Sequence, residues 1–367
     1  MANAGQPIIA LAPNTLLNNG RYRIERELNR GGTAVVYAAE DTTTQQYVAL
    51  KVMNGPDQVP VKVVKREIAF SAAARHDNIV RLLDVFAEKA QLIIVWELIS
   101  GPDLLDLLNE HEGRMPEPMA AFFFCQLLQA VMFMHNNGFC HRDIKPENCM
   151  VQRASHQLKL IDFGLSKHLE SARTLGVGTP DYLSPEMLQV WTNYTGTPVP
   201  YDARAVDAWA MGVLMFLLIT GKYPFEDPGH PNNLAHTIHN VLAGRMCPFP
   251  DHMSAGCREL ISGLLRIDPR QRTTLQATTH PHTPHSYLLP TCVSQKKKCL
   301  VDSHAITLAH QSTHTNTAAV TPLQQLSCHT HSFSFSRLCR AWLLTHGSCS
   351  KLALMHRQWV GWICWSL

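Results

Sequence analysis

Strand-like and helix-like patterns occupy separate parts of this chain, on either side of Gly101-Pro102. Short β-rich runs such as Tyr47–Val52, and the continuous apolar run Leu92–Trp96, come before that point. Apolar residues with helical spacing follow it, over Asp103–Glu110 and Pro116–Asn137. The sequence therefore predicts a small sheet-rich part joined to a larger helix-rich part.

Size and charge limit what such a chain can be. Its 367 residues predict two or three domains, or one large bilobed domain with a tail. Hydrophobic residues make up 46% of the chain and charged residues 17%, so a packed core is expected. The net charge of +3 is too balanced for a polybasic protein, and we expect no nucleic-acid partner.

The composition changes near residue 286. From Ser286 onward there are seven basic residues and one acid, together with six of the eleven cysteines and four of the seven tryptophans. We predict a flexible leader over 1–21, one domain over 22–285 and a disordered or non-native tail over 286–367. Zinc binding around Cys328–Cys339 and contact of the last tryptophans with a membrane surface remain as alternatives.

Cysteine usage and hydropathy bear on the compartment. The other five cysteines are scattered without a framework, which favours free thiols in a reducing environment. No basic start followed by an apolar run indicates a secretory signal. The uncharged run Ala208–Gly221 is too short to span a bilayer and predicts a buried helix. We expect an intracellular protein, cytoplasmic or nuclear, without a membrane span.

Two early features suggest anion binding without settling it. Gly31-Gly32 lies between strand-like runs, where backbone N–H groups can approach an anion, although a tight hairpin explains it equally well. Lys51 lies in the apolar run Val48–Val52, where a charge needs a partner or a ligand. Glu67 in a predicted helix could be that partner, and a solvated surface lysine is the alternative.

A more specific signal comes later in the chain. His141-Arg142-Asp143 is followed by Asn148, and Asp162-Phe163-Gly164 lies nineteen residues after Asp143. With the glycine pair, Val48–Lys51 and Ser184-Pro185-Glu186, these segments occur in the order and spacing of the protein-kinase signature set. Over about residues 22–285 the chain resembles a eukaryotic protein kinase.

That resemblance implies the fold and the reaction. The fold would be α+β and bilobed, with a small antiparallel-sheet N-lobe and one main helix over about 22–98. A larger, mostly helical C-lobe would span about 103–285. The reaction would be transfer of the ATP γ-phosphoryl group to Ser or Thr hydroxyls of protein substrates.

The resemblance also implies the roles of individual residues. Asp143 would orient the substrate hydroxyl and accept its proton, Lys145 would contact the γ-phosphate, and Glu67 would hold Lys51. Asn148 and Asp162 would bind Mg²⁺. Contacts with ATP would come from Leu28, Gly31, Gly32, Val36, Ala49, Lys51, Glu97, Ile99 and Asp103.

The chain departs from the family at three positions. Asn29 and Ala34 stand where glycines are expected, which predicts a weaker grip on the nucleotide. Trp96 would close the back of the adenine pocket, although a plain core aromatic is the alternative. These departures leave open a pseudokinase that acts as a binding module. The presence of Lys51 and Asp143 with both metal ligands favours catalysis.

Other segments indicate the kind of kinase. Lys145 and Gly178-Thr179-Pro180 resemble a Ser/Thr enzyme, and they disfavour a phosphotransferase of small molecules. Tyr223–Asp227 is similar to the calcium/calmodulin-dependent branch, with plant sucrose-non-fermenting-related kinases as the members most alike. Glu147 and Asp103 stand where related kinases bind arginine upstream of the target residue, although both acids could be solvated.

The last expectations concern support and regulation. By resemblance, Asp207 anchors the backbone of the catalytic loop, and Glu186 forms a buried ion pair with Arg272. Arg142 implies activation by a negative charge, for which Thr174 is the favoured phosphorylation site of an upstream kinase. Trp191–Tyr201 predicts an inserted surface loop, with a docking site as the alternative.

Overall fold

The computed structural model describes residues 10–31, 34–53, 61–89, 91–163, 167–168, 180–192, 201–231 and 233–279. Within these ranges, the side chains of 61–64, 66–67, 167–168, 180 and 190–192 are outside the description. The described chain divides into two compact units. A sheet unit holds the residues up to 61 together with 82–98, and a helical unit holds 62–81 and 99–279.

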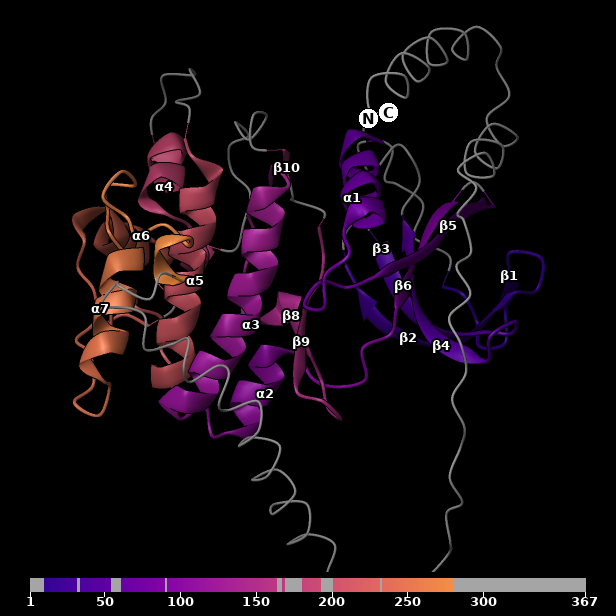
Figure 1. The fold of residues 1–367 in the computed structure, drawn as a ribbon, viewed down its shortest axis with the longest axis horizontal. Coiled ribbons are helices and arrows are strands. Elements are labelled where there is room, and N and C mark those ends of the chain that lie inside the picture. Colours follow the sequence, from indigo (N-terminus) through magenta and orange to yellow (C-terminus); the bar gives the residue numbers. More distant parts are fainter. Residues whose placement is uncertain are drawn as a thin grey trace, which may run out of the picture. The chain divides into compact units, whose positions relative to one another are not determined.

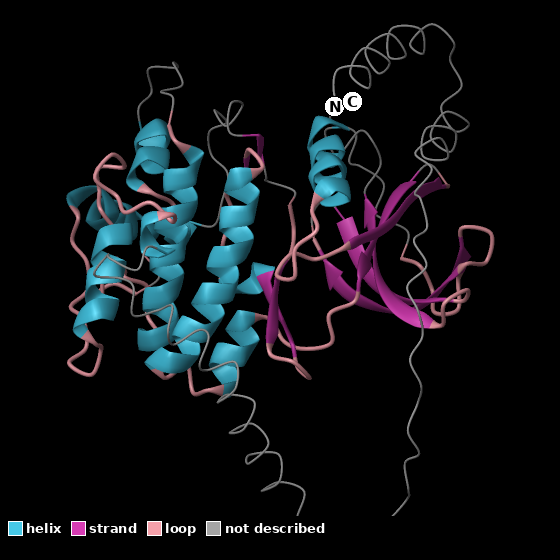
Figure 2. Cartoon of the chain, viewed as in Figure 1, coloured by secondary structure: helices cyan, strands magenta, loops and turns pink. Residues whose placement is uncertain are grey.

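The sheet unit is built on six antiparallel strands in the order β1-β2-β3-β4-β6-β5, drawn as magenta arrows in Figure 2. Adjacent strands in sequence are neighbours except where β4 pairs with β6. The strands are β1 (Leu16–Leu17), β2 (Tyr22–Arg30), β3 (Ala34–Asp41), β4 (Gln46–Met53), β5 (Leu82–Glu88) and β6 (Gln91–Glu97).

One face of this sheet forms a hydrophobic core. Because side chains alternate along a strand, β4 buries Val48, Leu50 and Val52 on the same side. The rings of Tyr22 and Phe86 stack in this core, with centroids 5.5 Å apart. The buried members of the cluster are Leu17, Tyr22, Ile24, Val35, Tyr37, Ala39, Val48, Leu50, Val52, Phe86, Ile93 and Val95.

The sheet begins inside the segment predicted as a leader. Leu16 and Leu17 form β1 against β2, and the side chain of Leu17 is buried in the core. The backbone N–H of Asn18 donates to the Glu88 carboxylate at 2.7 Å. The prediction of a flexible leader over 1–21 is therefore wrong for residues 16–17, and residues 1–9 lie outside the described chain.

The helical unit contains seven α-helices within the described residues, shown in cyan in Figure 2. They are α1 (Val61–Ala73), α2 (Leu104–Glu110), α3 (Glu117–Asn136), α4 (Pro185–Thr192), α5 (Ala203–Thr220), α6 (Leu234–Ala243) and α7 (Ala255–Leu264). Short strands are β7 (Phe139–Cys140), β8 (Cys149–Gln152), β9 (Gln157–Leu160) and β10 (Lys167–His168). Single 3₁₀ turns are η1 (Pro146–Asn148), η3 (Pro180–Tyr182) and η4 (Ala277–Thr279).

Helix α5 is the central helix of this unit, and α3 and α7 pack against it (Figure 1). Asp202 caps its first turn by accepting the N–H of Arg204, and Gly221 ends it in the left-handed conformation. A Cβ on Gly212 would lie 2.9 Å from side-chain atoms of Leu264 and Leu265, so glycine allows α7 to approach closely. The predicted buried helix over Ala208–Gly221 is confirmed.

Two helices in the described chain pass a length and composition test for membrane spans. They are α3 and α5. In their most apolar stretches of 18 residues, 61% of the residues of α3 and 83% of those of α5 are buried inside the structure. Burial of this kind is typical of core helices, so they are weak candidates for spanning a membrane.

Helix α1 groups with the helical unit, in which the ring of Phe70 packs 4.9 Å from that of Phe139. One predicted boundary is wrong. Trp191 and Thr192 belong to α4, so the predicted loop over Trp191–Tyr201 starts later; residues 193–200 lie outside the described chain.

The cysteine prediction holds for most of the described thiols. Cys140, Cys149, Cys247 and Cys257 are free, whereas Cys125 forms a disulfide. The prediction of free thiols is therefore wrong for Cys125.

Candidate active site

In the sheet unit, strand register gathers three of the predicted nucleotide contacts, Val36, Ala49 and Lys51, on one face. Lys51 in β4 lies opposite Val36 in β3 and Ile94 in β6. Ala49, two residues earlier, lies opposite Trp96. Directly opposed residues share a face, and this face is the reverse of the one that carries the core cluster. The sheet thus presents a lysine among small and apolar side chains.

The glycine-containing turn joins β2 to β3 at one end of this face. The N–H of Gly31 donates to the carbonyl of Ala34 at 2.9 Å, and Gly32 lies outside the described residues. Leu28 is 37% exposed, next to a register shift in β2. Asn29 is part of β2 and its φ is not positive, so the tolerance of asparagine for positive φ is not needed here.

Three predicted nucleotide contacts lie at the end of β6 or shortly after it. Glu97 ends that strand opposite Val48, and Ile99 lies two residues later; both are half-buried. Asp103 caps α2, where its Oδ1 accepts the N–H of Asp106 at 2.8 Å. One carboxylate oxygen of Asp103 is thus committed to the helix terminus.

The loop over residues 141–148 is held from below by Asp207 on α5. The Asp207 carboxylate accepts the N–H groups of His141 at 2.9 Å and Arg142 at 2.7 Å, and the His135 ring nitrogen Nε2 lies 2.8 Å from it. Burial alone would raise the pKa of Asp207, but these hydrogen bonds outweigh it and hold the pKa below the ordinary carboxyl value. The predicted anchoring role is confirmed.

Within this loop three predicted residues meet. Lys145 Nζ lies 3.2 Å from Asp143 Oδ2, and Asn148 Nδ2 donates to the same oxygen at 3.0 Å. Asn148 also donates to the backbone carbonyl of Asp143 at 2.8 Å. The Asp143 side chain is 13% exposed. A carboxylate held by a cation and an amide at fixed distances is suited to orienting a hydroxyl and accepting its proton.

The Asp162-Phe163 segment lies beside this loop. The N–H of Ile161 donates to the carbonyl of Asn148 at 2.9 Å. Phe163 is fully buried, with its ring 5.6 Å from that of His141 and 5.0 Å from that of Phe70. Asp162 is exposed and has φ +58°, so the turn buries the ring and leaves the carboxylate outward.

Two further predicted residues lie partly or wholly outside the described chain. Glu67 lies in α1, but its side chain is outside the description, so its pairing with Lys51 stays a prediction. Thr174 also lies outside the described residues. Arg142 is buried, has φ +71° and is hydrogen-bonded through its side chain to Tyr201.

The support below the site contains one predicted contact and one that the sequence analysis missed. Arg272 forms two bonds with Glu186, at 2.6 and 2.9 Å, and its guanidinium lies over the Trp209 ring. This confirms the predicted buried pair. His135 was missed, although a histidine near the end of the long apolar helix α3 could have signalled a buried polar partner.

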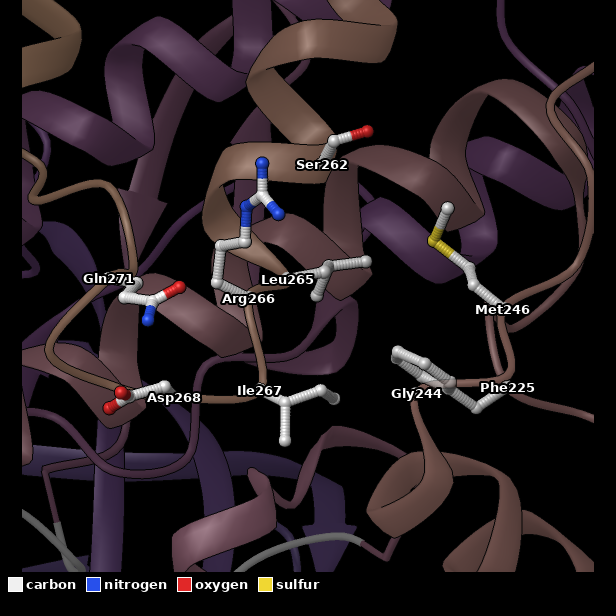
Figure 3. A pocket seen from close by; sticks show the side chains of 9 residues that line it. All are labelled: Phe225, Gly244, Met246, Ser262, Leu265, Arg266, Ile267, Asp268 and Gln271. Carbon is white, nitrogen blue, oxygen red and sulfur yellow. The ribbon is translucent and has the colours of Figure 1, made fainter.

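A surface hollow of the helical unit contains none of these residues. It measures about 660 Å³ and lies around the C-terminal ends of α6 and α7 (Figure 3). Its lining is Phe225, Gly244, Met246, Ser262, Leu265, Arg266, Ile267, Asp268 and Gln271. The predicted site residues lie instead on the catalytic loop of the helical unit and on one face of the sheet unit.

Comparisons of the sequence with known proteins identify the family of the chain. The family model "Protein kinase domain" matches residues 22–283. Serine/threonine-protein kinase SRK2E of Arabidopsis thaliana is 35% identical over 263 residues, which is 70% of each chain. Serine/threonine-protein kinase SAPK3 of Oryza sativa subsp. indica is 34% identical over 76% of this chain and 81% of its own. Serine/threonine-protein kinase SRK2A of Physcomitrium patens is 34% identical over 71% and 72%.

The family match covers strands β2 to β6 of the sheet unit and the helices that hold the catalytic loop. The matches support a Ser/Thr kinase reaction with ATP and protein substrates. They contradict the pseudokinase alternative. This chain belongs to the protein kinase family, as a Ser/Thr protein kinase similar to the plant sucrose-non-fermenting-related kinases.

Proposed function

We propose that this kinase phosphorylates Ser or Thr in protein segments that carry an arginine upstream of the target, and that Glu147 binds this arginine. The observation that carries the proposal is an orphaned atom. Glu147 Oε2 is buried and has no hydrogen-bond partner among the described residues. A buried carboxylate oxygen without a donor is costly, and a guanidinium from a substrate would supply one.

Phenols and acids surround Glu147. Burial raises the pKa of Tyr182 and Tyr223, and the negative charge of Glu147 adds to both shifts. The pKa of Asp181 is also raised, by burial first and then by the charge of Glu226. Such a cluster of acids and phenols favours a cation, and the planar guanidinium suits it better than an ammonium group.

Matched peptides test this specificity. The substitution Glu147→Gln keeps the shape of the side chain and removes its charge, and Glu259→Gln changes an exposed glutamate on α7 as the control. We expect Glu147→Gln to raise KM at least about tenfold for a peptide with upstream arginine and to leave a peptide with alanine there unchanged. Equal KM values for the arginine peptide in wild type and Glu147→Gln would contradict the proposal.

We also propose that Asn148 and Asp162 hold Mg²⁺. The amide nitrogen of Asn148 donates to Asp143, which leaves the amide oxygen for a cation. Asp162 presents an exposed carboxylate. Both are the hard oxygen donors that Mg²⁺ prefers. When bound, the metal would neutralise phosphate charge. Asp162→Asn should weaken the Mg²⁺ dependence of ATP binding, measured by thermal shift; an unchanged Mg²⁺ titration would contradict this assignment.

For the nucleotide we propose the residues that family membership indicates. Lys51 would bind the phosphates with Glu67 as its partner, and Asp103 would bind the ribose. The remaining contacts would come from Leu28, Gly31, Gly32, Val36, Ala49, Glu97 and Ile99. The shared face of Val36, Ala49 and Lys51 supports this assignment. Lys51→Met should lower ATP affinity while leaving the melting temperature of the free protein unchanged within a few degrees.

The burial of Arg142 in the catalytic loop bears on how the kinase is regulated. We propose that an upstream kinase phosphorylates Thr174. The negative charge of the phosphate would then orient the guanidinium of Arg142, which is buried. Thr174→Ala should abolish activation by phosphorylation. Equal turnover of wild type, dephosphorylated wild type and Thr174→Ala would overturn this proposal.

We further propose an intracellular location, without nucleic-acid or membrane partners. Four of the five cysteines in the described residues are free thiols, and this and the near-balanced charge of the chain support the proposal. Imaging of a fluorescent fusion in intact cells tests the location, and recovery of the protein in the secreted fraction would contradict it.

A further inference from the structure

Three side chains with metal-binding atoms meet where the loop after α5 leads into the first turn of α6. They are Asp227, His230 and His236, and their ligand atoms all lie within 4.8 Å of one another. Nδ1 of His236 lies 2.9 Å from Asp227 Oδ2, and Nδ1 of His230 lies 3.1 Å from the same oxygen. The two imidazole rings have centroids 4.4 Å apart. None of these atoms belongs to the kinase site described above.

The backbone fixes the positions of these three residues. The N–H of His230 donates to the carbonyl of Asp227 at 3.0 Å, which closes a turn. The second carboxylate oxygen, Asp227 Oδ1, accepts the N–H of Gly229 at 2.8 Å and so orients the carboxylate. Asn233 caps α6 and accepts the N–H of His236 at 3.3 Å, which places His236 in the first helical turn.

The loop is also tied to the core behind it. Asn240 on α6 donates through Nδ2 to the carbonyl of Phe225 at 3.1 Å. The Phe225 ring stacks on that of Trp209, with centroids 5.2 Å apart and planes 8° from parallel. Both sides of the cluster, the Asp227 side and the α6 side, are thus attached to buried residues. Such outer contacts are what positions the ligands of a metal site.

The spacing of the donor atoms suits a tetrahedral cation. Bonds of about 2.0–2.1 Å to nitrogen and oxygen place tetrahedral ligand atoms about 3.3 Å apart. The observed separations of 2.9 and 3.1 Å from the carboxylate oxygen need only small side-chain rotations to reach that value. The side chains are 30%, 60% and 43% exposed for Asp227, His230 and His236, so a cation can enter from solvent.

We propose that Asp227, His230 and His236 bind one zinc-class divalent cation, with water in the fourth position. Two imidazoles and one carboxylate are typical ligands of Zn²⁺ and do not suit Mg²⁺ or Ca²⁺, which prefer oxygen donors throughout. Binding requires each Nδ1 atom to be unprotonated, so that its lone pair faces the cation. The bound cation links the loop to the first turn of α6.

Zinc titration of the full chain tests the site. The chain has 20 histidines and 11 cysteines, so the readout is the difference in bound zinc between variants after removal of metal with a chelator. The variants are His236→Ala and His230→Ala. The matched control is His239→Ala, which removes an exposed histidine of the same helix whose ring contacts Arg245. Competition with a fluorescent zinc indicator gives the number of sites and their affinity.

We expect His236→Ala and His230→Ala each to lose one zinc equivalent, or to weaken it at least about tenfold, while His239→Ala keeps it. Zn²⁺ should raise the melting temperature of wild type and of His239→Ala more than that of either site variant. Because His230 is the most exposed of the three, its substitution leaves folding intact and keeps the test decisive. Equal zinc content and equal shifts in melting temperature in all four proteins would overturn the proposal.

Discussion

The carboxylate of Asp207 accepts the backbone N–H of Arg142 at 2.7 Å, across 65 residues of sequence. This bond and the one from His141 at 2.9 Å fix the start of the loop that carries Asp143. The position of the predicted proton acceptor therefore depends on a fully buried carboxylate on another helix.

Replacing Asp207 by alanine should destabilise the fold and reduce turnover together. The substitution leaves two backbone N–H groups and a histidine nitrogen without their acceptor, at about 1–3 kcal/mol for each buried group. The free energy of unfolding in urea should fall by at least about 3 kcal/mol. A variant with unchanged stability and unchanged turnover would show that the loop holds its shape without Asp207.

The pair Glu186–Arg272 is expected to be a large contributor to stability. Removing one partner of a buried pair costs about 3–5 kcal/mol, because a charge is left uncompensated. We expect that loss for Glu186→Gln, measured by urea denaturation. The matched control is Arg270→Ala, which breaks the solvent-exposed pair with Asp268 and should leave stability unchanged. Similar losses in both variants would contradict the assignment.

Two glycines with positive φ provide a graded test of backbone geometry. Gly113 has φ +78°, and a Cβ added there would have no atom of the described chain within 4 Å, so Gly113→Ala should cost about 1 kcal/mol from the conformation alone. Gly221 has φ +70°, and its Cβ would lie 2.3 Å from the carbonyl oxygen of Gly113. Gly221→Ala should therefore cost clearly more. A larger loss of stability for Gly113→Ala than for Gly221→Ala would contradict the close approach of Gly221 to the Gly113 carbonyl.

Asp41 predicts a pH dependence in the sheet unit. Burial alone would raise its pKa, but bonds from Arg21 and Thr43 outweigh burial and lower the pKa to about 2. Because the folded pKa lies below the ordinary value, the stabilisation is complete above that value and is lost as the pH falls toward about 2. Asp41→Asn keeps an acceptor for Thr43 and removes the charge.

The difference in melting temperature between wild type and Asp41→Asn should thus be constant above about pH 5 and shrink at lower pH. A difference that grows on acidification would show that the sign is wrong.

Much of the fold could be predicted from periodicity and motif spacing. The buried helix around Ala208–Gly221 and the strand around Leu92–Trp96 are visible as apolar runs because burial determines them. The pair Glu186–Arg272 could be predicted only through resemblance, since 86 residues separate the partners and no local pattern links them.

What could not be predicted depends on tertiary contacts. Leu16 and Leu17 join the sheet because Leu17 fills space beside β2, which a short apolar pair does not signal. The meeting of Asp227 with His230 and His236 follows from a turn and a helix cap. Sequence spacing alone did not place these donors together, because side-chain direction in a loop depends on its exact backbone path.

The most direct test is transfer of labelled phosphate from ATP to Ser/Thr peptides with upstream arginine, comparing wild type with Asp143→Ala. Asp143 is held by Lys145 at 3.2 Å and Asn148 at 3.0 Å, so its removal takes away the positioned proton acceptor. We predict incorporation on Ser or Thr by wild type and a loss of at least about a hundredfold in the variant. Equal incorporation by both proteins would contradict the account.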